Sequence, residues 1–129
     1  FRRFVNRTGN DRSEDVAAFR ARLIDCGRSF VERAGLCRER IADRSLEFIQ
    51  DDSTILVHSY SRVVLGLLVR AAGENRRFRV LVTESRPNAR GTRAARLLRQ
   101  HGIPTTVVLD SAAGHYMGRA DLVLVGAEG

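Results

Sequence analysis

Polar and charged side chains follow two apolar segments of the chain, at the point where each segment ends. The first set is His58, Ser59, Tyr60, Ser61 and Arg62, and the second is Thr83, Glu84, Ser85 and Arg86. Guanidinium groups, hydroxyls and the N-terminus of a following helix are groups that bind phosphate and other anions. An imidazole and a carboxylate can also move protons. These residue types predict a site for an anionic ligand.

The elements that must position these side chains alternate between strands and helices. Apolar runs predict strands at residues 54–58, 78–82, 105–109 and 121–125, and helices are expected at 61–72, 89–101 and 111–117. Gly73 and Gly102 lie where helix C-caps are expected. Short links between strands that are apolar on both faces indicate a parallel α/β sheet with flanking helices. Because ligands gather at the carboxyl ends of such strands, both polar sets are expected at one edge, together with Asp110 and Glu128.

The first part of the chain has a different pattern. From Val16 to Phe48 an apolar or small residue recurs every three or four positions, which predicts an amphipathic helix. Asp11 and Glu14 offer an N-cap and the acidic partner of a capping box. The sequence thus predicts a partial helical N-terminal domain at residues 1–52 and the N-terminal half of a Rossmann-like domain at residues 53–129. The chain has no initiator Met and is expected to begin inside a longer protein or after processing.

Two cysteines, Cys26 and Cys37, lie on the apolar stripe of the predicted helix. About 16 Å separates them at 1.5 Å rise per residue, which is too far for a disulfide, and metal motifs need closer spacing. We expect both to be small core residues. Gly27 and Gly35 allow the helix to kink without changing its buried face. This cysteine usage fits a reducing compartment such as the cytoplasm.

Composition narrows the classes of function. All 22 basic residues are Arg, the net charge is +7, and residues 53–129 carry 11 Arg against 5 acids. This excess of positive charge in the second part of the chain can attract phosphates, RNA or an acidic protein. Only 6% of residues are aromatic and none interleave with the arginines, so direct nucleic-acid binding is not expected. The sequence lacks a run long enough for a membrane span, a G-x-G-x-x-G fingerprint, a phosphate loop and a nucleophile elbow. We expect no cofactor and no metal.

Several ordered motifs resemble a known family. They are Thr54-Ile55-Leu56-Val57-His58-Ser59-Tyr60-Ser61-Arg62-Val63-Val64, Val82-Thr83-Glu84-Ser85-Arg86-Pro87, residues 104–110 and residues 120–129. Together they look like the alpha subunit of eukaryotic translation initiation factor 2B, whose members are roughly twice this length. The resemblance implies a regulatory, non-catalytic subunit of the guanine-nucleotide exchange factor for initiation factor 2. It implies a homodimer that binds the other subunits and senses phosphorylated initiation factor 2.

The same superfamily contains ribose-1,5-bisphosphate and methylthioribose-1-phosphate isomerases, which are the alternative. The resemblance implies that these enzymes carry a catalytic Cys at the position of Ser59 and a catalytic Asp at the position of Glu128. A hydroxyl does not titrate near neutrality as a thiol can, and Glu moves its carboxylate one methylene further out. These departures predict a protein that is not an enzyme.

The remaining polar groups could still hold a phosphate or a sugar phosphate without transforming it. The predicted ligand-binding residues are His58, Ser59, Ser61, Arg62, Glu84, Arg86 and Glu128, with the two glutamates expected on sugar hydroxyls. The alternative is that these groups satisfy one another at the sheet edge. The arginines that recur on residues 89–101 are expected to form a solvated helix face, and RNA or protein binding is the alternative for them.

Overall fold

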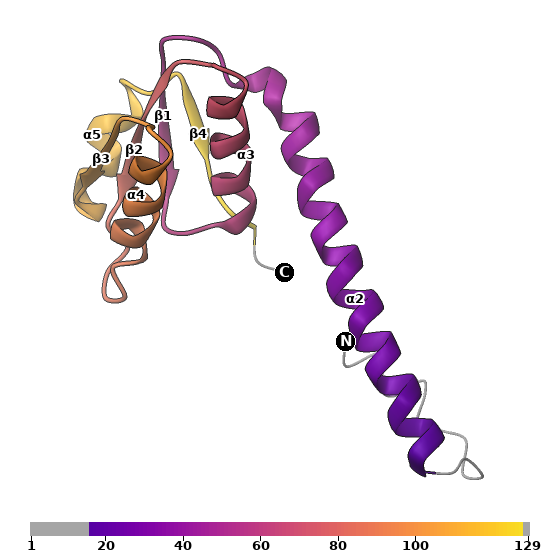
Figure 1. Ribbon diagram of the computed structural model, residues 1–129. Coiled ribbons are helices and arrows are strands. Elements are labelled where there is room, and N and C mark those ends of the chain that lie inside the picture. Colours follow the sequence, from indigo (N-terminus) through magenta and orange to yellow (C-terminus); the bar gives the residue numbers. More distant parts are fainter. Residues whose placement is uncertain (1–15, 128–129) are drawn as a thin grey trace. The chain divides into compact units, whose positions relative to one another are not determined.

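The computed structural model describes residues 16–127 (Figure 1). The elements follow the order α2 (Val16–Ser45), the 3-10 helix η1 (Leu46–Phe48), β1 (Ser53–His58), α3 (Arg62–Gly73), β2 (Phe78–Thr83), α4 (Arg90–Gln100), β3 (Thr105–Val108), the 3-10 helix η2 (Asp110–Ala112), α5 (Ala113–Met117) and β4 (Leu122–Leu124). The predicted alternation of strands and helices is confirmed, and strand and helix ends move by only one or two residues. The predicted cap at Asp11 and Glu14 lies outside the described residues.

The strands form one parallel sheet in the order β3-β2-β1-β4. Strand β1 lies inside the sheet, and its His58 is in register with Thr83 at the end of β2. Thr83 is in turn in register with Val108 at the end of β3. The carboxyl ends of three strands therefore meet at one edge of the sheet, as the sequence predicts.

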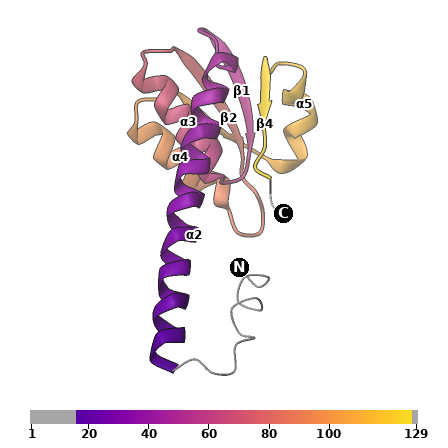
Figure 2. The same ribbon diagram turned by 90° about the vertical axis from the view of Figure 1, so that its right-hand side faces the viewer.

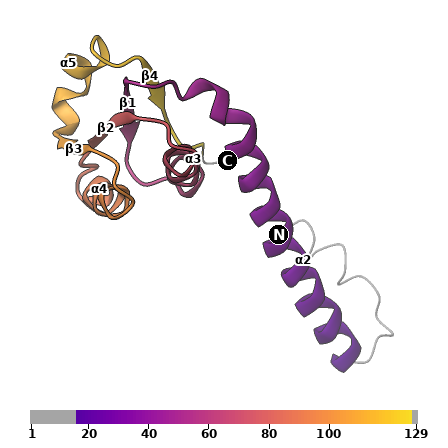
Figure 3. The ribbon, with the colours of Figure 1, turned by 45° about the horizontal axis from the view of Figure 1, so that its top comes forward.

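Helices α3 and α4 cover one face of the sheet, and α5 lies on the other (Figures 2 and 3). Ile55 and Val57 of β1 are fully buried and pack with Leu68 of α3 and Leu98 of α4. Strand β1 is buried on both faces from Ser53 to Val57 as expected, whereas β2 exposes Arg79 on one face and β3 and β4 are not buried on both. Val123 of β4 is 43% exposed, because β4 is an edge strand and the short α5 covers little area.

One of the two predicted helix caps is wrong. Gly102 adopts φ +75° directly after α4 and ends that helix as expected. Gly73 is instead the last residue of α3, and Glu74 is the C-cap. Asn75 follows with φ 64°, in the left-handed conformation that the sequence assigned to glycine. Asn is the ordinary substitute for Gly there, because its short polar side chain tolerates this conformation.

The prediction that both cysteines are core residues is also wrong. Helix α2 continues through Gly27 and Gly35, but Cys37 is exposed and Cys26 is only partly buried. Along the predicted stripe Phe30 is 50% exposed. An amphipathic pattern predicts that a segment is helical and which of its faces is apolar. Whether that face is buried depends on what packs against it, which the pattern does not identify.

The chain divides into two compact units, residues 1–37 and residues 38–129. The first contributes the N-terminal part of α2, and the second contains the sheet and the helices that flank it. The domain boundary near residue 52 stays a prediction. No helix among residues 16–127 has the length and the apolar composition that crossing a membrane requires.

Candidate functional site

Sharp turns follow β1 and β2 at the carboxyl edge of the sheet. Ser59 has φ 61° and Ser85 has φ 62°, a left-handed conformation that is uncommon for residues other than glycine. The turns bring the two side chains together, and the Ser85 hydroxyl donates a hydrogen bond to the Ser59 hydroxyl over 2.9 Å. Left-handed backbone of this kind concentrates at ligand sites, where the surrounding structure holds it in place.

A cleft of about 750 Å³ opens beside these turns. The residues that line it are Arg38, His58, Ser59, Tyr60, Ser61, Arg62, Val63, Arg90, Gly126 and Ala127. Three of these side chains are guanidinium groups, and among residues 16–127 no carboxylate lines the cleft. The cleft is therefore cationic and suits an anion that can accept several hydrogen bonds.

Three different elements supply the arginines of the cleft. Arg38 comes from α2, Arg62 is the first residue of α3, and Arg90 is the first residue of α4. Helix starts carry unpaired backbone N–H groups and a partial positive charge, so two of the arginines lie where an anion is already favoured. Ser61 is the N-cap of α3, and its hydroxyl accepts a hydrogen bond from the backbone N–H of Val64.

Two glycines allow the cleft walls to approach closely. A Cβ on Gly91 would lie 1.7 Å from the carbonyl oxygen of Thr83, so the start of α4 lies directly against the end of β2. A Cβ on Gly126 would lie 2.9 Å from the Ser61 side chain, so the segment after β4 lies against the start of α3. Neither wall can accept a larger residue without moving.

Asp110, two residues after the end of β3, organises the neighbouring turn. Its carboxylate accepts hydrogen bonds from the backbone N–H groups of Ser85 and Arg86, each over 2.8 Å. The N–H of Arg86 and then that of Ser85 lower the pKa of Asp110 below its ordinary value, because both stabilise the ionised carboxylate. Sequence analysis placed Asp110 at this edge but gave it no role. Its position two residues beyond a strand end was the available signal.

The structure brings together four of the seven predicted ligand-binding residues. His58, Ser59, Ser61 and Arg62 line the cleft. Glu84 and Arg86 do not line it and instead form an ion pair with each other, with 3.0 Å between Nε and Oε2. Glu128 lies outside the described residues.

Sequence reasoning missed two of the cleft's arginines. Arg90 was assigned to a solvated helix face, although its place at the start of a helix that follows a strand was a usable signal. Arg38 lies on a helix far from the strand-end motifs in sequence, and no local pattern distinguishes it. Tyr60 also lines the cleft, with the guanidinium carbon of Arg93 5.1 Å from its ring centroid.

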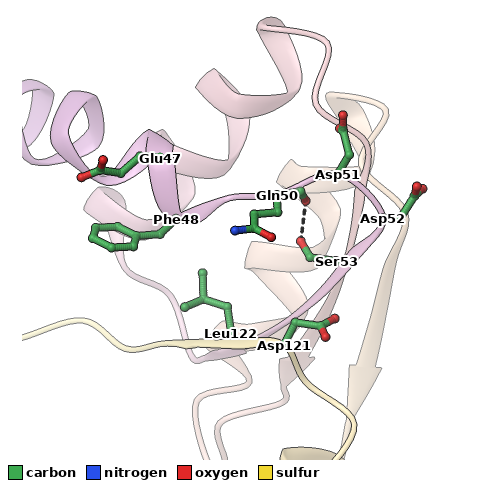
Figure 4. A pocket seen from close by; sticks show the side chains of 8 residues that line it. All are labelled: Glu47, Phe48, Gln50, Asp51, Asp52, Ser53, Asp121 and Leu122. Atoms are coloured by element: carbon green, nitrogen blue, oxygen red, sulfur yellow. Dashed lines mark hydrogen bonds between the residues drawn. The ribbon is translucent and has the colours of Figure 1, made fainter.

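A second cavity, of about 320 Å³, lies at the opposite ends of the strands (Figure 4). Its lining includes the carboxylates of Glu47, Asp51, Asp52 and Asp121. Two of these have structural partners: Asp121 accepts a hydrogen bond from the backbone N–H of Thr54, and Asp51 accepts one from that of Arg77. Among residues 16–127 no group of three or more His, Cys, Asp or Glu side chains is arranged to hold a metal ion.

A parallel α/β sheet flanked by helices, with a cationic cleft at the carboxyl edge of its strands, is a Rossmann-like arrangement. The chain belongs to the Initiation factor 2 subunit family, whose model matches residues 1–129. It is 38% identical over 128 residues to translation initiation factor eIF2B subunit alpha of Dictyostelium discoideum, a match that covers 99% of this chain and 40% of that protein. The resemblance identified from the sequence motifs is thereby confirmed.

Two further similarities bear on function. The chain is 32% identical over 114 residues to ribose 1,5-bisphosphate isomerase of Thermococcus kodakarensis, covering 88% of this chain and 35% of the isomerase. It also superposes on the crystal structure of the tetrameric eIF2B-beta2-delta2 complex from C. thermophilum, with a TM-score of 0.77 and 26% identity over 98% of this chain and 42% of that one. The chain thus spans less than half the length of these relatives.

Proposed function

We propose that the protein containing this chain is a regulatory subunit of the guanine-nucleotide exchange factor for translation initiation factor 2, acting in the cytoplasm. The observation that carries the proposal is the 38% identity to an eIF2B alpha subunit over 99% of this chain. In this proposal the protein forms a homodimer, joins the other subunits of the factor and senses phosphorylated initiation factor 2. The likeness to a complex of beta and delta subunits supports the association with other subunits.

We also propose that the protein is not an enzyme. The sugar-phosphate isomerase is the alternative, favoured by the cationic cleft and by the 32% identity to such an isomerase. Ser59 stands where the resemblance implies a catalytic thiol. Within residues 16–127 the Ser59 side chain hydrogen bonds with another hydroxyl, that of Ser85, and not with a general base. An unactivated hydroxyl remains protonated near neutrality, so the proton transfer that isomerisation requires has no thiolate here.

The cleft is proposed to bind a phosphorylated small molecule without transforming it. Arg38, Arg62 and Arg90 converge on it, and the start of α3 adds backbone donors. A hydrogen bond to a charged group contributes about 1.5–3 kcal/mol, so two or three sustain micromolar to millimolar binding after ordering costs. Such a ligand would couple the abundance of a metabolite to the assembly or activity of the exchange factor.

The regulatory role is tested by reconstituting the exchange factor with and without this subunit. Nucleotide release is measured from unphosphorylated and from phosphorylated initiation factor 2. Without the subunit we expect exchange to lose its sensitivity to phosphorylation. Equal sensitivity in both preparations, or an intact mass of the complex that leaves no room for the subunit, would refute the proposal. Turnover of ribose 1,5-bisphosphate above about 1 per second would instead support the isomerase alternative.

The cleft is tested by calorimetric titration of the full-length protein with a sugar monophosphate. Arg62→Ala and Arg90→Ala are each expected to weaken binding by about tenfold or more, because each removes a charge-assisted hydrogen bond. Arg86→Ala and Arg119→Ala remove the same charge outside the cleft lining and serve as matched controls that should bind like the wild type. Equal weakening by all four substitutions would show a diffuse charge effect and no site.

A further inference from the structure

Helix α4 concentrates positive charge that no acidic side chain of its own segment offsets. Four of its eleven residues are arginines, and residues 85–109 contain no Asp and no Glu. The glycine and the two alanines of α4 are buried, whereas Arg93, Arg96 and Arg99 are exposed. These three side chains form the α4 arginine face, and the fourth arginine, Arg90, lines the cleft. Along the helix the face is about 9 Å long and turns through about 120°, so one partner segment can contact all three side chains.

Helices α2 and α3 each contain an arginine that is paired with a nearby acid, and α4 does not. In α2 Arg28 lies 4.0 Å from Asp25, and at the end of α3 Arg70 lies 3.6 Å from Glu74. None of the ion pairs formed among residues 16–127 includes an arginine of α4. Like charges three residues apart on a helix repel each other, and cations in its first turn oppose the helix dipole. The charges of α4 therefore destabilise the isolated helix, and a partner that brings negative charge would remove this effect.

Neutral groups hold two of the three guanidinium groups of the face in place. Nε and Nη2 of Arg99 donate to the carbonyl oxygen of Thr105 over 3.0 and 2.7 Å. The guanidinium carbon of Arg93 lies 5.1 Å from the ring centroid of Tyr60. Neither partner carries a charge, so both arginines keep their positive charge while their side chains lose part of their freedom. A ligand that binds them therefore loses less conformational entropy on binding than it would against free side chains.

We propose that the α4 arginine face binds an acidic segment of a partner protein, whose carboxylates accept hydrogen bonds from the guanidinium groups. A planar guanidinium group matches the two oxygens of a carboxylate and can bind both at once. The backbone of RNA would be attracted by the same charge, but residues 85–109 contain no Phe, Tyr or Trp on which bases could stack. The three arginines of the face do not line the cleft, so this inference does not depend on the ligand that the cleft holds.

The test measures binding of a fluorescent oligoglutamate peptide to the full-length protein by fluorescence anisotropy. A peptide of about twelve residues is long enough to cross the face. The wild type is expected to bind it, with an affinity that falls as salt rises from about 0.05 M to about 0.5 M, because ions screen exposed charges. Arg93→Gln combined with Arg96→Gln is expected to weaken binding about tenfold, roughly threefold for each exposed ion pair. Arg44→Gln combined with Arg119→Gln removes the same charge from exposed positions outside α4 and should bind like the wild type.

Several outcomes would overturn the inference. One is a wild type that does not bind the peptide, and another is equal weakening by the two double variants. An oligouridine RNA of the same length that binds more tightly than the peptide would assign the face to nucleic acid instead. If Arg62→Ala in the cleft weakens the peptide as strongly as the α4 double variant does, the peptide occupies the cleft and the inference is wrong. Arg96→Gln alone leaves the contacts of Arg93 and Arg99 in place, and its expected threefold weakening decides the question if the double variant does not fold.

Discussion

Gly91 offers the sharpest test of how the cleft is assembled, because its missing side chain brings two backbone segments together. It is the second residue of α4, and its N–H donates to the carbonyl of Glu84 over 3.0 Å. In a Gly91→Ala variant the new Cβ would lie 1.7 Å from the carbonyl oxygen of Thr83, whereas real Cβ contacts stay beyond 3.0 Å. The two segments must therefore separate by about 1.3 Å. Both are backbone, so no rotamer change relieves the clash.

The cost can be assembled from three contributions. Overpacking a well-packed contact costs about 1–3 kcal/mol. Loss of the hydrogen bond to Glu84 costs about 1 kcal/mol, and the higher helix propensity of Ala returns about 1 kcal/mol. The expected net destabilisation of Gly91→Ala is about 2 kcal/mol. The separation would also displace the neighbouring Arg90, so affinity for a phosphorylated ligand should fall with stability.

Urea unfolding of the full-length protein, followed by circular dichroism, measures this change. A loss of about 2 kcal/mol lowers the unfolding midpoint by roughly 1 M. Gly66→Ala is the matched control, because Gly66 lies within α3 and a Cβ there meets nothing within 4 Å. That variant should gain about 0.5–1 kcal/mol. If Gly91→Ala unfolds at the same urea concentration as the wild type, or a higher one, the close approach of α4 to β2 is incorrectly described.

Three other substitutions probe individual contacts. The pKa of Asp110 is lower in the folded protein than its unfolded value of about 3.9. Its ionised carboxylate therefore stabilises the fold fully above that unfolded pKa, and this stabilisation is lost as the pH falls through the lower folded pKa. The stability difference between wild type and Asp110→Asn, measured by urea unfolding from pH 6 downward, should therefore shrink below about pH 4; a constant difference would contradict the assignment. Asp121→Ala leaves the buried N–H of Thr54 without its side-chain acceptor and should cost about 1–3 kcal/mol in the same assay. Ala89 has φ 48°, so Ala89→Gly should raise the thermal midpoint, and a lowered midpoint would show that its conformation is unstrained.

Much of the fold follows from short stretches of sequence. Local sequence predicts strands β1 and β2 from their apolar runs, and it predicts the end of α4 from a glycine. Each of these signals depends on residues only a few positions apart. The parallel arrangement follows because strands and helices alternate with short links. The exposure of Cys37 could not be predicted in this way, since periodicity identifies a helix face without identifying what covers it.

The sequence by itself determined which chemical groups stand at the strand ends, including a hydroxyl at Ser59. Only the tertiary structure decided which of the 22 arginines converge on the cleft. Arg86 forms an ion pair with Glu84 and does not line the cleft, whereas Arg38 lines it from a helix that precedes the whole sheet in sequence. The physical reason is range: propensity and periodicity act over a few residues, whereas the position of a guanidinium group depends on strand register and helix packing across the entire domain.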